Sequence, residues 1–262
     1  MTRKLAVVTG ASSGIGAATA QALGARGWTV VLVARRREEL TGVAQRVETA
    51  GGRAVVEALD AADPAAVAAM AGRVRSQHGA PWVIVNSAGA GAWRWPEDTP
   101  PDEMERMLDA PYRAASHVTQ AFLPDLLAQH AGTIIHVGSP ASLVPWPGAT
   151  GYTVSRWALR GLHEALRQDL AGTGVSTCHV LFSEVATPYF DRNDGAKERR
   201  PAIGRIVPVA TAPECAEVIL RTIDRPKAQV LHPPMLRLLM AVHRVAPPLT
   251  RWLLRVTGAR RR

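Results

Sequence analysis

The feature that most constrains this 262-residue sequence is a regular alternation of short apolar runs with longer helical patterns. Strands that are apolar on both faces, interleaved with helices, are typical of a parallel sheet covered on both sides. The pattern therefore predicts a single α/β domain with a doubly wound parallel sheet. The six runs are KLAVVTG, TVVLVA, AVVEALD, PWVIVNSAG, TIIHVGS and VSTCHVLF.

The excess positive charge lies at one end of the chain. Nine of the 31 Lys and Arg residues fall in residues 225–262, which contain no Asp or Glu, and the other 22 balance the 22 acidic residues. A nucleic-acid-binding protein more often carries a basic face on its folded domain, so that partner is not predicted. We expect one domain over residues 1–233 and a basic amphipathic tail over residues 234–262.

The pattern of the tail predicts two short helices separated at Pro247 and Pro248. Apolar residues recur at helical spacing with arginines between them, and neither half has the roughly 20 apolar residues needed to span a bilayer. A helix of this kind suits peripheral contact with an anionic membrane. It suits packing across a subunit interface equally well, with the arginines extending outward.

Cysteine content and the N-terminus bear on the compartment. Cys178 and Cys215 have neither the CxxC nor the Cys/His spacing of a metal site, so no metal is expected. The chain begins with too few apolar residues for a signal peptide, which favours a cytoplasmic protein, with peripheral membrane contact left open.

Four histidines without ligand spacing are expected to serve packing: His117, His136, His163 and His179.

A glycine-rich turn joins the first predicted strand to the first predicted helix. In VVTGASSGIG, Gly10, Gly14 and Gly16 allow the backbone to approach a pyrophosphate, and the following helix N-terminus offers free N–H groups. Ser12 and Ser13 add hydroxyl donors. This turn predicts nucleotide binding.

Together with NSAG at 86–89, and Ser139 thirteen residues before Tyr152, this turn resembles the motifs of the short-chain dehydrogenase/reductase family. The resemblance runs from about Lys4 to about Pro233. It implies a Rossmann-type dinucleotide-binding and catalytic domain, an oxidoreductase acting on a small molecule, and a homodimer or homotetramer. It also implies a cofactor-contacting set: Gly10, Ser12, Ser13, Gly14, Ile15, Gly16, Asp60, Asn86, Ala88, Gly89, Tyr152, Arg156 and Thr187.

The end of the second predicted strand bears on the choice of cofactor. A carboxylate there would select NAD, but the strand ends in Ala34 and is followed by Arg35 and Arg36. A guanidinium can pair with a 2′-phosphate, so the sequence predicts NADP. The alternative is a solvated basic start to the next helix.

The catalytic residues that the resemblance implies are Ser139, Tyr152 and, in place of the family's lysine, Arg156. In the family, the serine binds the substrate oxygen, the tyrosine exchanges its proton, and the lysine holds the ribose and assists the tyrosine. Arg156 keeps the positive charge one helical turn from Tyr152, but a guanidinium is larger and is a poor proton relay. We expect an impaired but working site.

Two further positions depart from the family. Pro111 stands where an asparagine usually holds a water in the proton path, and Asp109 would point elsewhere on a regular helix. Phe182 and Ser183 replace the Pro-Gly that usually begins the loop beside the nicotinamide. That change places Glu184 near the nicotinamide end, where it either takes part in hydrogen bonding or faces solvent.

Three tryptophans bear on the substrate. Trp93 and Trp95 follow the fourth predicted strand and Trp146 follows Ser139, in loops where this architecture binds ligands. They suit a bulky apolar substrate, or packing beneath a lid formed by residues 189–204.

Three functions are compatible with these residues. The first is an NADPH-dependent carbonyl reductase or alcohol dehydrogenase, favoured because the serine and tyrosine are retained. The second is a cofactor-binding regulatory or partner subunit without hydride transfer. The third is a non-redox enzyme on the same scaffold, such as a cyclase or dehydratase.

Overall fold

The computed structural model describes residues 4–260. Its centre is a seven-stranded parallel sheet in the order β3-β2-β1-β4-β5-β6-β9, and a separate pair, β7 and β8, is also parallel. The strands are β1 (Leu5–Thr9), β2 (Thr29–Ala34), β3 (Arg53–Ala58), β4 (Val83–Asn86), β5 (Gly132–Gly138), β6 (Val175–Phe182), β7 (Val185–Ala186), β8 (Ala210–Thr211) and β9 (Gln229–His232).

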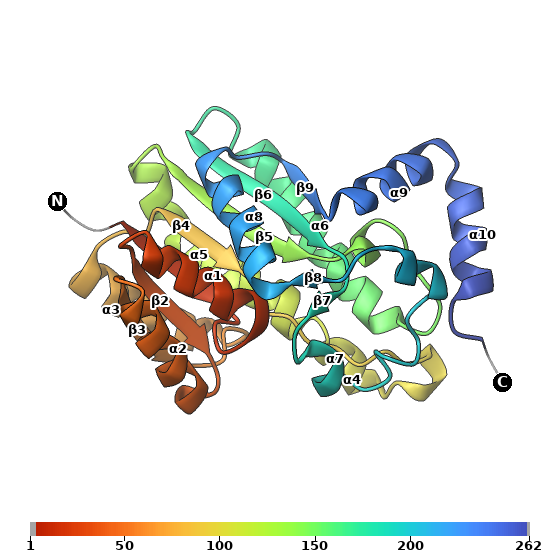
Figure 1. The fold of residues 1–262 in the computed structure, drawn as a ribbon. Helices are drawn as coiled ribbons and strands as arrows, with labels where there is room; N and C mark the ends of the chain where they lie inside the picture. Colours follow the sequence, from red (N-terminus) through yellow and green to blue (C-terminus); the bar gives the residue numbers. More distant parts are fainter. Residues whose placement is uncertain (1–3, 261–262) are drawn as a thin grey trace.

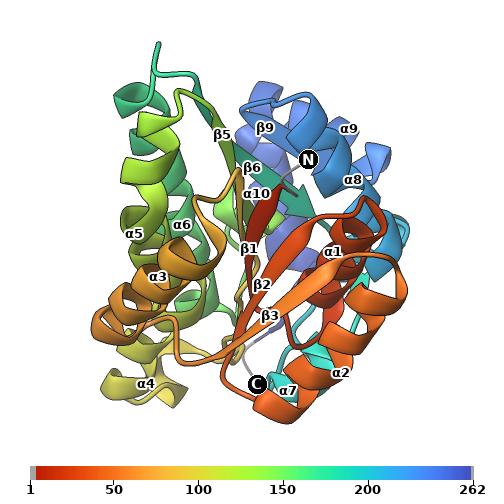
Figure 2. The same cartoon turned by 90° about the vertical axis from the view of Figure 1, so that its left-hand side faces the viewer.

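Helices cover both faces of the sheet, which confirms the predicted doubly wound fold. Figures 1 and 2 show α1, α2 and α8 on one face and α3, α5 and α6 on the other. The helices are α1 (Gly14–Ala25), α2 (Arg37–Thr49), α3 (Pro64–His78), α4 (Pro101–Arg106), α5 (Ala114–Ala128), α6 (Thr150–Asp169), α7 (Tyr189–Arg192), α8 (Ala212–Asp224), α9 (Pro234–Val245) and α10 (Pro247–Thr257). Short helical turns lie at Pro96–Asp98, Asp109–Arg113, Pro140–Ser142 and Ala202–Ile206.

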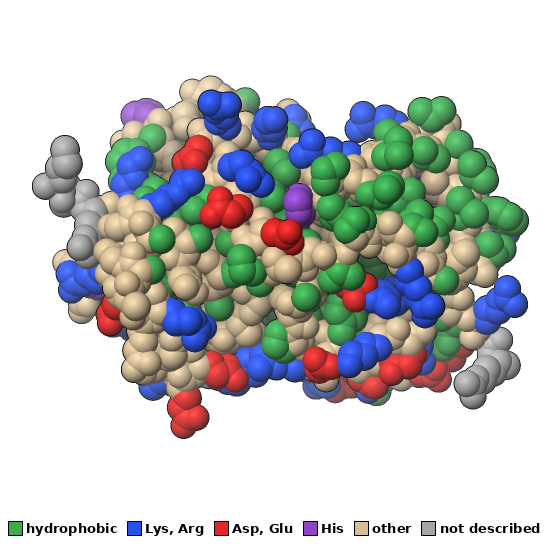
Figure 3. Space-filling model, viewed as in Figure 1, with side chains coloured by type: hydrophobic (Ala, Val, Ile, Leu, Met, Phe, Trp, Pro, Cys, Tyr) green, Lys and Arg blue, Asp and Glu red, His purple; other side chains and the backbone are tan. Residues whose placement is uncertain are grey.

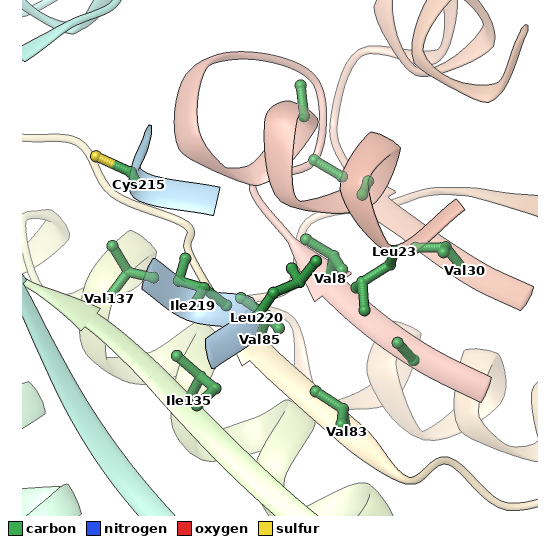
Figure 4. Close-up of a cluster of buried hydrophobic side chains, with 14 of the residues drawn as sticks. Val8, Leu23, Val30, Val83, Val85, Ile135, Val137, Cys215, Ile219 and Leu220 are labelled. Atoms are coloured by element: carbon green, nitrogen blue, oxygen red, sulfur yellow. The ribbon is translucent and has the colours of Figure 1, made fainter. Parts of the chain in front are cut away.

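The core divides between the two faces of the sheet. One cluster lies under α1, α2 and α8, and Figure 4 shows Val8, Leu23 and Ile219 converging within it. The other lies under α3 and α5 and includes Phe122 and Ile134. Because each strand is apolar on both faces, burial on both sides stabilises the sheet more than one covered face would.

The parallel register brings the ends of the strands to one edge. Thr9 pairs with Val33 of β2 and with Asn86 of β4. Its hydroxyl also accepts hydrogen bonds from the backbone N–H groups of Ser87 and Ala88, at 3.1 and 3.2 Å. The glycine-rich turn and the NSAG turn therefore lie side by side.

The tail forms two helices, α9 and α10, which Figure 1 shows beyond the β9 edge of the sheet. The break between them is Ala246, and Pro247 and Pro248 are the first two residues of α10. Across residues 4–260, none of the helices combines the length and apolar character needed to cross a bilayer.

The sequence patterns missed part of the sheet. β9 was not among the six apolar runs because QVLH is only four residues long and lies between Pro226 and Pro233. The β7–β8 pair has two residues per strand, which is too short to show an alternating pattern.

Three of the histidines meet inside the protein, as packing groups. His136 of β5 and His179 of β6 are register partners, and the ring of His163 on α6 lies 6.0 and 5.5 Å from theirs. Burial lowers the pKa of His136 to about 3 and of His163 to about 4, and it lowers the pKa of His179 well below its usual value. All three rings are therefore neutral in the folded protein at neutral pH.

This cluster predicts a loss of stability in acid. An unfolded histidine binds a proton near pH 6.5, so between about pH 6.5 and 4 the unfolded chain holds more protons than the folded one. As the pH is lowered through this range, the free energy of unfolding should decrease by about 1.4 kcal/mol per pH unit for each buried ring. Urea titrations of His179→Leu should show a shallower pH dependence, because leucine binds no proton in either state. The substitution should break no hydrogen bond, since neither ring nitrogen of His179 has a partner among the described residues.

The control for this experiment is His130→Asn. His130 is exposed and has a positive φ of 49°, which asparagine tolerates. An unchanged pH slope in His179→Leu, or an equal change in His130→Asn, would contradict the prediction.

Candidate active site

A pocket of about 880 Å³ opens at the carboxyl edge of the sheet. The glycine-rich turn, the strand ends, α6, the segment after β7 and the two tail helices all contribute to its walls. It brings together every candidate site residue except Asn86: Gly10, Ser12, Ser13, Gly14, Ile15, Gly16, Arg35, Arg36, Asp60, Ala88, Gly89, Ser139, Tyr152, Arg156 and Thr187.

The glycines of the first turn leave no room for side chains. A Cβ on Gly10 would lie 2.7 Å from the carbonyl oxygen of Ser87, and one on Gly16 would lie 2.4 Å from that of Gly10. Gly10 and Gly14 also have positive φ values of 64° and 55°. This tight turn brings the backbone at the start of α1 to the pocket wall, which fits a dinucleotide pyrophosphate.

Arg35 and Arg36 both line the pocket but differ in their partners. Arg36 forms an ion pair with Glu39, and its Nη2 lies 3.4 Å from the Ser12 hydroxyl. Arg35 has no acidic partner among residues 4–260. The Arg35 guanidinium is therefore more available than that of Arg36 to pair with an anionic ligand.

The segment after β7 reaches back across the pocket to the first turn. Arg192 of α7 donates a hydrogen bond to the hydroxyl of Ser13 at 3.2 Å, and its guanidinium lies 3.8 Å from Glu39. Nearby, Thr187 packs against the turn, where a Cβ on Gly14 would lie 3.2 Å from its methyl group. Residues 187–192 thus cover the glycine-rich turn, a position that suits the predicted lid.

The guanidinium of Arg156 lies inside the pocket wall. Its carbon is 4.8 Å from the centre of the Tyr152 ring, and the residue is only 6% exposed. On its other side, a Cβ on Gly89 would lie 2.8 Å from Nη2. The absence of a side chain at position 89 is therefore what makes room for an arginine one turn after the tyrosine.

Ser139 follows β5 and lies on the same pocket wall as Tyr152. Its hydroxyl accepts a hydrogen bond from the N–H of Ala141 at 3.3 Å, which orients it at the start of a short helical turn. The hydroxyl proton remains free to donate to a substrate oxygen.

Aromatic rings surround Tyr152. The rings of Trp93, Trp146 and Tyr189 lie 5.1, 6.3 and 6.2 Å from its own, and Phe190 packs against Trp93 at 6.2 Å. Burial raises the pKa of Tyr189, and neighbouring Tyr152 raises it further, so Tyr189 stays a neutral phenol. The candidate proton donor therefore stands in an apolar wall.

Pro111 lies in a π-helical turn, Asp109–Arg113, and not in a regular helix. The N–H groups of Tyr112 and Arg113 both donate to the carbonyl of Leu108, so the chain tolerates a residue without an N–H. The π-helical turn also changes which side chains face the pocket. Asp109 lines the pocket, contrary to our expectation, and forms an ion pair with Arg113 at 2.6 Å. Pro111 is buried and is not among the residues that line the pocket.

Two other expectations met a different arrangement, and a third had left two alternatives open. The Asn86 side chain points into the core, donating to the hydroxyl of Thr119 at 3.1 Å, and does not line the pocket. Of the two alternatives for Glu184, the structure shows the polar interaction: Glu184 lines the pocket and forms an ion pair with Arg200. Trp95 is not among the lining residues, unlike Trp93 and Trp146.

Three residues of the pocket wall were not predicted individually: Tyr189, Phe190 and Arg192. They lie in YFDRNDG, a polar and glycine-bearing stretch that indicated a lid without indicating which side chains face inward. Their positions depend on contacts with Trp93 and Ser13, which are about 100 and 180 residues away in the sequence.

Comparison with known proteins assigns the family. Residues 4–198 match the family profile described as short chain dehydrogenase. The chain belongs to the short-chain dehydrogenase family. An uncharacterized oxidoreductase of Mycobacterium tuberculosis is 36% identical over 233 residues, covering 86% of each chain. One of Staphylococcus epidermidis is 32% identical over 197 residues, covering 75% of this chain and 84% of the relative.

Solved structures of short-chain dehydrogenases share the fold. A metagenomic short-chain oxidoreductase in complex with NADP is 30% identical, with a TM-score of 0.74, covering 87% of this chain and 95% of its own. A short-chain dehydrogenase/reductase of Burkholderia phymatum in complex with NAD has a TM-score of 0.83 at 23% identity, covering 99% and 98%. Such structures thus hold either cofactor, and the protein is an oxidoreductase of this family.

The free charge of Arg35 leads to a test of cofactor choice. Arg35→Ala should weaken NADPH binding roughly 10- to 100-fold, the value of one charge-assisted contact, and leave NADH binding unchanged. Fluorescence titration with each cofactor measures both constants. The control is Arg37→Ala, which removes an exposed arginine that does not line the pocket. Equal losses for NADPH and NADH, or in the control, would argue against a 2′-phosphate contact.

Proposed function

We propose that the protein is an NADPH-dependent oxidoreductase that reduces the carbonyl of a bulky apolar substrate, or oxidises the corresponding alcohol, with Ser139, Tyr152 and Arg156. The observation that carries the proposal is the burial of the Arg156 guanidinium against the Tyr152 ring. A guanidinium turned out into solvent could neither assist the phenol nor hold a ribose. Here it is held at the pocket wall.

Each of the three residues has a distinct task. The Ser139 hydroxyl donates to the substrate carbonyl oxygen and fixes its position. The Tyr152 phenol gives that oxygen its proton in reduction and takes it back in oxidation. Arg156 supplies a fixed positive charge and N–H donors for the cofactor ribose, although it passes no proton onward. Bound NADPH supplies the hydride.

NADPH is proposed over NADH because of the charges at the end of β2. Arg35 and Arg36 follow Ala34 at the pocket, and no carboxylate occupies that strand end. The glycine-rich turn, Asp60, Ala88, Gly89 and Thr187 are the further contacts proposed for the dinucleotide. The proton path is altered, since Pro111 contributes no polar side chain.

The aromatic wall supports the choice of substrate. Trp93, Trp146, Tyr189 and Phe190 surround the proposed proton donor, and Leu239 and Leu253 of the tail helices close the pocket. These surfaces suit a hydrophobic or polycyclic ketone better than a small polar aldehyde. A homodimer or homotetramer is proposed through α5 and α6, where Val154 and Trp157 are exposed.

Turnover by Tyr152→Phe tests the reaction. With a bulky apolar ketone, loss of NADPH absorbance should slow about 10²- to 10⁴-fold, as expected for removal of a general acid. The dissociation constant of NADPH should stay within a few-fold of wild type. Wild-type protein that binds NADPH but turns over no ketone or aldehyde of a broad panel would instead indicate a cofactor-binding subunit without hydride transfer.

Filling the space at Gly89 with a methyl group tests whether the Arg156 guanidinium lies there. Gly89→Ala should lower kcat about tenfold, because the added methyl displaces the guanidinium. The same change made together with Arg156→Lys should cost much less, since a lysine side chain is narrower, and Arg156→Lys alone should raise turnover. The control is Gly161→Ala. Gly161 lies on α6, as Arg156 does, and a Cβ there would meet nothing within 4 Å. Equal losses from Gly89→Ala in both backgrounds would contradict this placement.

A further inference from the structure

Each tail helix has one face toward the pocket and another that is exposed. Their inner side chains, which include Leu236, Leu239, Leu253 and Leu254, line the pocket. The end of α10 then meets the loop after Ser139, where a Cβ on Gly258 would lie 3.1 Å from Pro147. The inner face is thus turned toward the pocket, and the end of the helix pair packs on the domain.

The outer face is apolar and uncovered. On α9 it consists of Met235, Leu238, Val242 and Val245, spaced three and four residues apart. Val245 is 87% exposed, whereas Val242 lies at the border of this face, 38% exposed, and also lines the pocket. On α10 it consists of Leu249, Trp252 and Val256 in the same spacing. Figure 3 shows apolar side chains gathered over this part of the molecule. We call these seven residues the outer tail face.

Exposed arginines flank the outer tail face. Arg237 and Arg244 lie along one side of the stripe on α9, and Arg251 and Arg255 occupy the corresponding positions on α10. None of the four pairs with an acidic residue in the part of the chain that the structure describes. Residues 225–262 contain no Asp or Glu that could balance them.

We propose that the outer tail face docks on the surface of an anionic phospholipid membrane, with its apolar residues at the acyl boundary and its arginines among the headgroups. The charge selects this occupant over a second copy of the chain. A two-fold interface would bring two sets of these arginines into one contact, where no acidic residue of the tail balances them. An anionic surface instead attracts each of them. With 12 and 11 residues, α9 and α10 are too short to cross a bilayer, so they would lie in its interface.

Vesicle flotation of the full-length protein tests the proposal. It should float with vesicles of equal parts phosphatidylcholine and phosphatidylglycerol, and far less with phosphatidylcholine alone or in high salt. Leu249→Ser with Trp252→Ser should weaken binding at least about tenfold by removing apolar contact. Arg251→Gln with Arg255→Gln should weaken it roughly 30-fold at low salt.

Controls for these pairs come from the opposite end of the molecule. Trp82→Ser removes a half-exposed tryptophan outside the tail, and Arg46→Gln with Arg53→Gln removes two exposed arginines. Neither should change flotation, and thermal unfolding verifies that all variants are folded. Binding requires no cofactor or ketone, so its failure leaves the proposed reaction standing, and loss of turnover leaves docking standing.

Two results would overturn the proposal. One is wild-type protein that does not float, or floats equally with neutral and anionic vesicles. The other is a concentration-dependent dimer in sedimentation that dissociates in Leu249→Ser with Trp252→Ser, which would make a second copy the occupant.

Discussion

Parallel hydrogen bonding of β1 to β2 on one side and to β4 on the other is the constraint on which the rest of the molecule depends. It brings the carboxyl ends of the strands to one edge, where every loop that follows a strand must begin. The Thr9 hydroxyl reinforces this alignment by accepting from two N–H groups of the NSAG turn. The glycine-rich turn, Arg35, Ala88 and Ser139 therefore meet in one pocket although the sequence separates them widely. Loops on a rigid sheet can vary in chemistry without loss of the fold.

Within that pocket, the neighbours of Arg156 provide space and contacts for its guanidinium. Gly89 leaves the space that Nη2 fills, and the Tyr152 ring provides a face for the cation. The same adjustment occurs at Pro111, where a π-helical turn takes up a residue without an N–H and turns Asp109 toward the pocket. Arg156 and Pro111 thus both lie in local structure that has room for them.

The tail combines two roles in one pair of helices. Its inner faces line the pocket, and its outer faces carry apolar residues bordered by arginines that have no acidic partner among residues 4–260. An amphipathic helix that packs only on its own domain needs no outward apolar stripe, because polar residues there avoid the cost of exposing apolar surface. The second stripe therefore points to a surface outside the chain. A pocket walled by these helices lies directly behind the face that we propose meets lipid.

The sequence by itself determined the fold class, the glycine-rich turn, the Ser139–Tyr152 interval and the helical character of the tail, because each depends on local periodicity or on spacing along the chain. It missed β9, which is too short to show a period. The family resemblance placed Asn86 among the cofactor contacts, whereas a hydrogen bond to Thr119 turns that side chain into the core. Only the tertiary structure decided which residues of the lid face inward and where the Arg156 guanidinium lies. Those positions depend on contacts between residues far apart in sequence, such as Arg192 with Ser13 and Arg156 with Gly89, and no local pattern encodes them.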